Sequence, residues 1–343
     1  MRCAVAILAL VFALFVQVVP ASATPAGNGG FASGDAVMRW IMDYRLKPEP
    51  GRLPVAVRAM SRFGAFKDTE SSGVYVGFIA GVLGANPARA EGLVGRMLSI
   101  PEADQWAIIR AIAYSGLPDW KSLMGKFAER MPMRKVMIEK YLSGALPALD
   151  AVPFEKRNPT LWDKVTGKPD NPNEATFDHN PELLDTLWGI YFATGSERAV
   201  LRIVAMLPWS KERDSTDRLT VGSMAKFTLT SNAARDIGLL ATLKGTLPQQ
   251  PRETAVVLKE VIDAADTMDA TRVRKQALAA IEELKRKGPG IKRDVSFWGQ
   301  VGQGALALGC IVAATTGHIE FGLPCVVGGA ASSAMLQFWN NQQ

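Results

Sequence analysis

The sequence contains very few of the side chains on which metal and nucleophile chemistry depends. Its 343 residues include only 2 His and 3 Cys, which nearly excludes a zinc site built from several such ligands. It also lacks the motifs of phosphate-binding loops, serine hydrolases and zinc peptidases. The 39 basic and 33 acidic residues leave a net charge of only +6, scattered along the chain. We therefore expect no metal or other cofactor and no nucleic-acid partner.

The first 23 residues have the pattern of a cleaved export signal. Arg2 precedes an apolar run over residues 4–19, and Ala21-Ser22-Ala23 follows with the small-x-small form that signal peptidase needs. We expect a mature chain that begins near Thr24 and lies outside the cytoplasm, in the periplasm or envelope or secreted, as in exported bacterial proteins. An uncleaved anchor helix is the alternative, but the run is short for a bilayer span.

From about residue 31 to 287, apolar residues recur at intervals of three and four, which predicts amphipathic helices. Trp106, Ile109 and Ile112 form one such apolar stripe, while Arg110 points elsewhere. Runs with the period-two alternation of strands are not evident, so the predicted class is all-α. Helix starts are expected at Pro87, Pro101, Pro118 and Pro181, and helix ends at Gly84, Gly116, Gly144 and Gly195.

The predicted helices come in pairs. The pairs cover residues 78–98, 111–129, 190–207 and 227–244, each with a small residue between the two helices. This arrangement resembles a degenerate helix–turn–helix repeat of the tetratricopeptide or HEAT kind, which implies an α-solenoid. Consensus positions do not repeat cleanly, so an irregular helical bundle is the alternative.

The composition divides the chain into regions. We expect a signal peptide at 1–23, helical regions at 24–146 and 181–287, a Pro/Asn-rich linker or loop at 147–180, a basic hinge at 288–294 and an apolar hairpin at 295–343. Structureless loops as long as 147–180 are typical of linkers, lids and functional insertions. Trp162 and Phe177 are expected to hold this loop against the surface.

His179 is the one candidate for acid–base chemistry in the helical part. It lies beside Asp178 and close to Glu182 and Asp185, so it could act as a general base or as a single metal ligand. A solvated His at the start of a helix is the simpler interpretation, and on that basis no catalytic residue is assigned.

The last 49 residues differ sharply from the rest, because residues 295–317 and 321–339 carry no charge. Each run is about long enough to cross a hydrocarbon core of roughly 30 Å, the second only just. Small residues recur at four-residue intervals, which lets two helices pack closely. These positions are Ala305, Gly309, Ala313 and Gly317 in the first run, and Gly329 and Ser333 in the second. The pattern resembles a glycine-zipper hairpin, as seen in several bacterial envelope and membrane-inserting proteins. A helical hairpin buried in the soluble fold is the alternative.

Basic residues precede the hairpin, and we expect them to contact an anionic lipid surface; they are Lys285, Arg286, Lys287, Lys292 and Arg293. Export would leave them outside the inner membrane, against the positive-inside tendency. Three possibilities therefore stay open: the hairpin inserts late or into another membrane, it lies in the membrane interface, or it is soluble.

Removal of the signal leaves two cysteines, Cys310 and Cys325, in an oxidising compartment. They form a disulfide only if the hairpin brings their Cα atoms within about 7 Å. Two buried free thiols are the alternative.

These patterns favour a non-enzymatic function. We expect an exported, envelope-associated scaffold that binds a protein partner through its helices and associates with a bilayer through residues 295–339, with oligomerisation through the hairpin as a further option. One alternative is a secreted protein that inserts into a target membrane, as a pore-former or effector. Another is a hydrolase of an envelope polymer that uses carboxylates the sequence does not identify.

Overall fold

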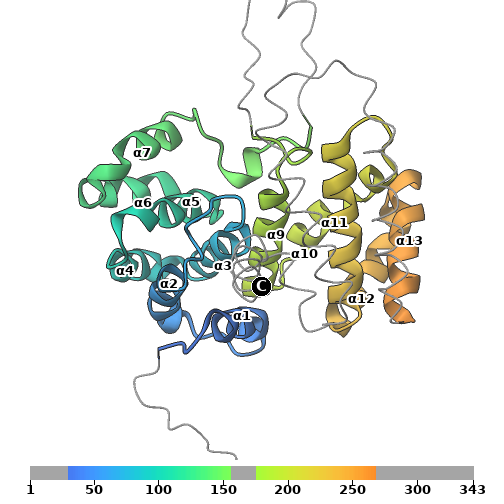
Figure 1. The fold of residues 1–343 in the computed structure, drawn as a ribbon, viewed down its shortest axis with the longest axis horizontal. Helices are drawn as coiled ribbons and strands as arrows, with labels where there is room; N and C mark the ends of the chain where they lie inside the picture. The colour runs from blue at the N-terminus through green and yellow to red at the C-terminus, as the bar shows by residue number, and fades with distance from the viewer. Residues whose placement is uncertain (1–29, 156–174, 268–343) are drawn as a thin grey trace, which may run out of the picture. The chain divides into compact units, whose positions relative to one another are not determined.

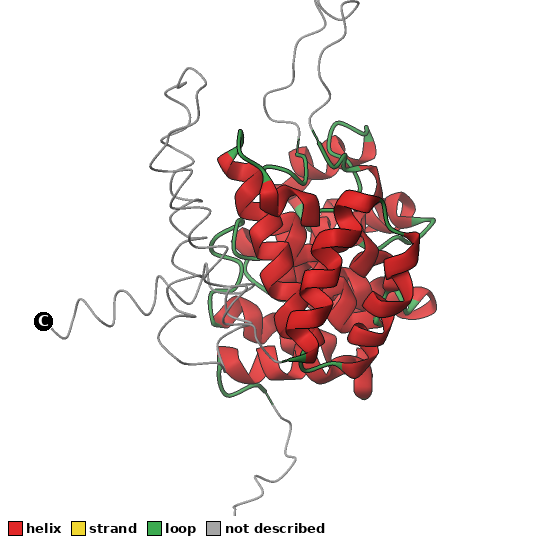
Figure 2. Ribbon diagram, turned by 90° about the vertical axis from the view of Figure 1, so that its right-hand side faces the viewer, coloured by secondary structure: helices red, strands yellow, loops and turns green. Residues whose placement is uncertain are grey.

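A computed structural model describes residues 30–155 and 175–267, and this part of the chain is all-helical (Figures 1 and 2). It contains twelve α-helices and no strand within those ranges, which confirms the predicted all-α class. The helices are α1 (Gly34–Asp43), α2 (Leu53–Arg62), α3 (Gly73–Gly84), α4 (Pro87–Met97), α5 (Trp106–Tyr114), α6 (Trp120–Phe127), α7 (Lys135–Leu142), α9 (Pro181–Thr194), α10 (Glu197–Val204), α11 (Thr216–Ala233), α12 (Ile237–Thr246) and α13 (Arg252–Asp266).

Short 3-10 turns complete several connections between these helices. Those used below are η5 (Pro132–Arg134), η6 (Leu149–Ala151) and η7 (Leu207–Lys211). Among the described residues, none of the helices combines the length and the apolar character needed to cross a bilayer.

Several predictions concern residues outside the described ranges. They are the export signal, Trp162, the five basic residues between 285 and 293, the pair Cys310 and Cys325, and the apolar hairpin with its small residues. These interpretations, and the predicted region boundaries, stay predictions.

The centre of the described fold is the contact between α3 and α9 (Figure 1). Helix α3 has no charged residue and is buried along almost its whole length, because a helix that is apolar all round must be surrounded by protein. Glycines let the two backbones touch: a Cβ on Gly77 would lie 2.7 Å from the carbonyl carbon of Thr186, and one on Gly189 would lie 2.5 Å from the amide nitrogen of Phe78. At Gly77 and Gly189, therefore, a side chain larger than hydrogen does not fit.

This contact joins the two predicted helical regions, because α3 precedes residues 147–180 and α9 follows them. Their apolar side chains form one continuous hydrophobic core. The four predicted helix pairs are all present, as α3–α4, α5–α6, α9–α10 and α11–α12. In a linear repeat array each unit contacts only its neighbours. The packing of α3 on α9, far away in the sequence, favours the irregular bundle.

Local signals placed several helix boundaries correctly. Pro181 begins α9, and Gly116 and Gly195 follow helices with positive φ angles of 70° and 68°, which glycine adopts without strain. Gly84 does end a helix, as predicted, but without the positive φ angle of Gly116 and Gly195. It is the last residue of α3, and a Cβ there would collide with the carbonyl of Ser115. Gly84 therefore serves close packing.

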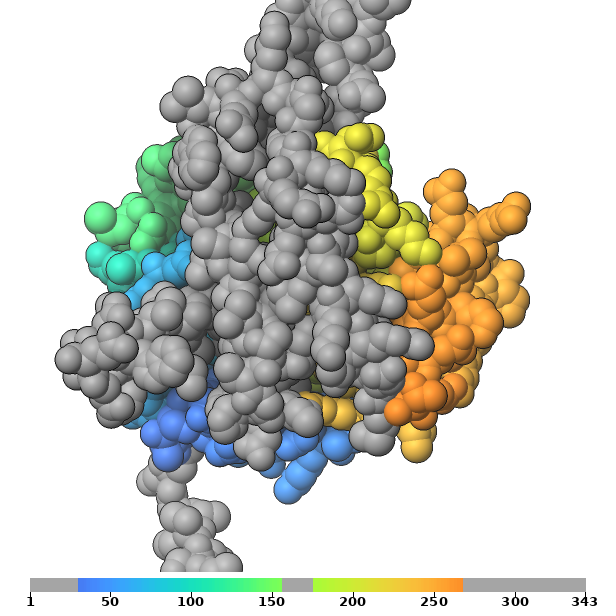
Figure 3. Space-filling view, turned by 45° about the vertical axis from the view of Figure 1, so that its right-hand side comes forward, coloured from blue at the N-terminus to red at the C-terminus, as the bar shows by residue number. Residues whose placement is uncertain are grey.

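Helix α11 is buried although its sequence is polar on every side. The buried hydroxyl of Thr228 is satisfied internally, because it donates to the carbonyl of Met224 at 2.8 Å and accepts from Trp188 Nε1 at 2.9 Å. Its buried ammonium, Lys226, pairs with Glu260 of α13 at 2.6 Å. Helix α13, orange at the surface in Figure 3, is thus tied to the interior by a charged contact.

We predict that Gly77→Ala lowers the free energy of unfolding by about 3 kcal/mol, the upper end of the usual cost of overpacking a core, because backbone atoms of α9 occupy the place of the new methyl group. The matched control is Gly92→Ala in the exposed part of α4, where a Cβ meets nothing within 4 Å. It should raise stability by about 0.5–1 kcal/mol through helix propensity. Urea unfolding measures both. Equal effects of the two substitutions would contradict the close crossing of α3 and α9.

Candidate functional site

The two described ends of the predicted 147–180 loop lie side by side. The amide of Phe177 donates to the carbonyl of Pro153 at 3.1 Å, and the amide of Asp178 donates to the carbonyl of Phe154 at 3.0 Å. The rings of Phe154 and Phe177 stack with their centroids 5.2 Å apart. Phe177 is fully buried, so it does hold this segment to the body, as expected.

Arg202 of α10 fixes the same two segments from one side. Its guanidinium carbon lies 4.5 Å from the ring centre of Phe177 and 5.4 Å from that of Phe154, which is cation–π geometry. The guanidinium also donates to the carbonyls of Leu149 (3.0 Å) and Val152 (3.2 Å), in and after η6. One side chain therefore holds both ends of the loop.

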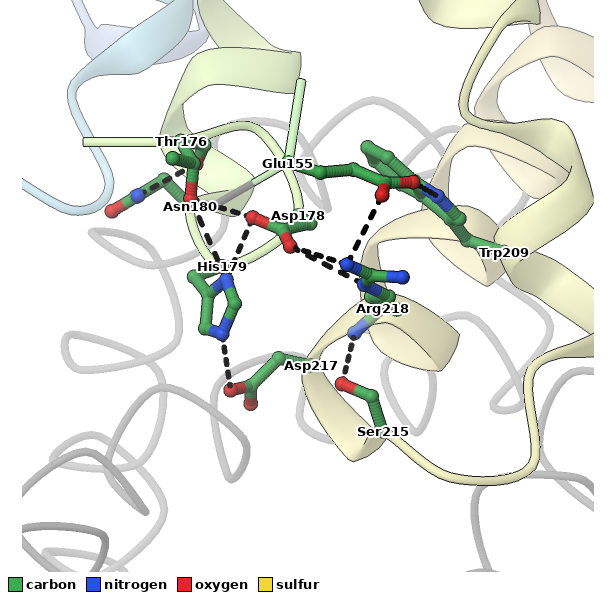
Figure 4. A network of polar contacts seen from close by, with 9 residues as sticks. All are labelled: Glu155, Thr176, Asp178, His179, Asn180, Trp209, Ser215, Asp217 and Arg218. Carbon is green, nitrogen blue, oxygen red and sulfur yellow. Dashed lines mark hydrogen bonds and ion pairs between the residues drawn. The ribbon is translucent and has the colours of Figure 1, made fainter. Parts of the chain in front are cut away.

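Asp178 is the centre of a polar cluster between residues 175–180 and α11 (Figure 4). Its side chain is completely buried and accepts hydrogen bonds from Arg218 Nε (3.3 Å) and Nη2 (3.2 Å), and from the hydroxyl of Thr176 (2.5 Å). A further contact, 2.7 Å long, joins it to His179 Nδ1. Burial acts to raise the pKa of Asp178, but these bonds and the charges of His179 and Arg218 outweigh it and hold the pKa below its usual value. The buried carboxylate is therefore ionised at neutral pH.

His179 lies between two carboxylates. Its Nδ1 contacts Asp178, and its Nε2 lies 3.9 Å from Oδ2 of Asp217, in the first turn of α11. The hydrogen bond to Asp178 is the main cause that raises the pKa of His179; the charges of Asp178 and Asp217 add to it, while burial and Arg218 oppose it. Burial raises the pKa of Asp217 in spite of the nearby imidazole. About half of the His179 side chain is exposed.

Arg218 extends the cluster to the opposite segment. Its Nη2 lies 3.3 Å from Oε2 of Glu155, and the other oxygen of Glu155 accepts from Trp209 Nε1 of η7 at 3.2 Å. Ser215 caps α11 by accepting a hydrogen bond from the Arg218 amide. The contacts in Figure 4 therefore connect Glu155, residues 176–180, η7 and the start of α11.

The polar contacts of this cluster hold Glu155, residues 176–180 and the start of α11 together, and we call this arrangement the clamp. An imidazole oriented by a carboxylate is the arrangement of a general base. Here, however, the described contacts of His179 beyond Asp178 are with Asp217 and, at 3.5 Å, with the hydroxyl of Thr176, which donates to Asp178. Across the described ranges, the structure holds no group of three or more His, Cys, Asp or Glu side chains arranged for a metal ion. We assign these residues a positioning role.

The sequence identified only part of this cluster. Of the three acids expected near His179, Asp178 does contact it. Glu182 instead forms an ion pair with Arg110 of α5, and Asp185 is buried within α9. Arg218, 40 residues from Asp178, had no local signal beyond its place in the first turn of a helix.

Comparison with known proteins finds no family model that matches the chain, and no similar curated protein or solved structure.

We predict that Asp178→Ala lowers the free energy of unfolding by about 3 kcal/mol, because it removes the buried acceptor of Arg218, Thr176 and His179. The control Asp214→Ala removes an exposed acid just before α11 and should change stability by less than about 0.5 kcal/mol. Urea unfolding compares the two variants. A loss for Asp178→Ala no larger than that of the control would disprove the clamp.

We predict that the stability difference between the wild type and His179→Gln depends on pH. The pKa of His179 is raised in the folded state, so its contribution is complete below about pH 6.5 and is lost as the pH rises through the folded-state pKa. The difference should therefore be larger at acidic than at alkaline pH. It should stay below about 1 kcal/mol, because the ring is half-exposed. Unfolding curves on either side of neutrality measure it, and a difference that grows with pH would contradict the ion contacts.

Proposed function

We propose that this protein is a non-enzymatic scaffold of the bacterial cell envelope. Its helical body binds a protein partner, and residues 295–339 associate with a membrane. The observation that carries the proposal is the change in composition along the chain: a body with charged residues in each described helix except α3 is followed by a run of 23 residues, 295–317, without any charge. Export through residues 1–23 would deliver the chain to that compartment.

The ion pairs of the body support a scaffold. They join elements that are distant in the sequence, as Arg45 with Asp236, Arg110 with Glu182, and Arg218 with Asp178. Ion pairs of this kind cost desolvation energy and restrict the geometry of the elements they join. A body held in this way presents its surface in one fixed arrangement, which suits recognition of a partner.

The helix pairs are consistent with this role. In helical-repeat proteins, successive pairs expose a continuous set of helix faces to a partner. We propose that the second helices of the four pairs, α4, α6, α10 and α12, expose their outer faces in the same manner, on a body whose core is closed by the contact of α3 with α9.

A second candidate is a secreted protein whose hairpin inserts into a target bilayer. The four-residue spacing of Ala305, Gly309, Ala313 and Gly317 supports it, because that spacing lets inserted helices associate. The hydrolase alternative would use carboxylates that the sequence does not identify.

We predict that deletion of residues 295–343 releases the protein from the envelope. Produced in a bacterium, the full chain should lose its first 23 residues, as mass spectrometry would show, and should sediment with the membranes. The deleted chain should be soluble in the periplasmic fraction, because its long uncharged runs are gone.

The matched control is a full-length chain with His179→Gln, which should sediment as the wild type does. A wild-type chain that is soluble in the periplasm would refute the membrane association. A chain found in the medium that releases dye from liposomes would support insertion instead, and loss of polymer cleavage after mutation of a clustered Asp/Glu pair would support the hydrolase.

A further inference from the structure

One end of the helical body has exposed apolar side chains next to unpaired basic ones. Met133 in η5 and Val136 in α7 are 71% and 66% exposed, and they lie three residues apart, so they face the same side. On the other side of α7, Ile138 and Tyr141 are buried in the core. The core therefore fixes the orientation of α7, which keeps Met133 and Val136 in water.

The surroundings of these two residues are basic. Residues 120–142 contain six basic and two acidic side chains, a net charge of +4. Lys135 and Lys140 are exposed, and in the described part of the chain neither forms an ion pair. By contrast, Lys126 of α6 pairs with Glu91 of α4 at 2.6 Å. With Glu139, an exposed acid on the same helix, the two lysines leave one net positive charge next to Val136 for an external anion.

The two most exposed apolar residues of the described body, Leu46 and Ile237, lack such surroundings. Leu46 and Ile237 are 75% and 86% exposed, but they directly follow Arg45 and Asp236, which form an ion pair with each other. Charge is therefore balanced beside them.

We infer that Met133, Lys135, Val136 and Lys140, which we call the η5–α7 surface, contact an anionic lipid surface. Apolar side chains flanked by Lys and Arg are the composition with which surface helices enter the headgroup region of a bilayer. Met133 and Val136 enter that region, and the two lysines pair with lipid phosphates. A protein partner with an acidic surface would use the lysines, but it would not explain why the apolar pair is left in water next to them.

This contact is separate from that of residues 295–339 and goes beyond the proposed function. It gives the helical body its own membrane-facing side, so that the body would be held in one orientation on the lipid. The opposite arrangement, a body suspended only by its C-terminal region, would leave Met133 in water.

The test is a fluorescent probe on the full mature chain. With the native cysteines replaced by Ser, an NBD group is attached at Met133→Cys, or at Ile237→Cys as the matched control. The chain is mixed with vesicles of phosphatidylglycerol and phosphatidylcholine, or of phosphatidylcholine alone. We expect a blue shift and a gain in intensity at position 133 on the anionic vesicles only, and no change at position 237. An unchanged probe at 133, or an equal shift on neutral vesicles, would overturn the inference.

A second pair of variants tests the charge, with the same probe at position 133. Lys135→Gln and Lys140→Gln should each lower the vesicle partition coefficient about five-fold at low salt. Glu139→Gln, at an exposed acid on the same helix, is the control and should leave binding equal or stronger. All three positions are exposed, and circular dichroism checks that the fold is kept. If the lysine variants bind as the wild type does, the lysines do not contact lipid and the inference fails.

Discussion

The close approach of α3 and α9 is the constraint on which the rest of the described fold depends. At Gly77 and Gly189 each helix places its backbone against the other, since no Cβ stands between them. This contact buries an entirely apolar helix and joins the chain before residue 147 to the chain after residue 180. The described parts of both helical regions therefore share one core.

The same contact bears on the interpretation of the C-terminal residues. Helix α3 carries Gly73, Gly77 and Gly81 at four-residue intervals, the spacing of Ala305 to Gly317. In α3, this spacing lets α9 pack closely against the helix, within the described fold. Small-residue spacing thus indicates close helix packing, in lipid or in protein, and only the long uncharged runs argue for a membrane at residues 295–339.

Charged contacts determine the geometry on both sides of the chain segment 156–174. Arg202 and Arg218, from α10 and α11, hold the two segments that flank it through stacking, carbonyl contacts and the buried carboxylate of Asp178. Buried ionic contacts of this kind contribute less to net stability than to the choice of one arrangement over others. The charged side chains of the η5–α7 surface are exposed instead. The charged side chains around Asp178 therefore position parts of the fold, whereas those of the η5–α7 surface are candidates for binding.

The sequence alone determined what depends on neighbours along the chain. Periodicity gave the all-α class, Pro181 and Gly195 marked the ends of α9 through local backbone preferences, and the adjacency of Asp178 and His179 predicted their contact. Only the tertiary structure decided that Arg218 completes this cluster, and that the glycines of α3 face α9. Those contacts join residues far apart in the sequence, and they depend on how the apolar helix faces pack together, which local patterns do not encode.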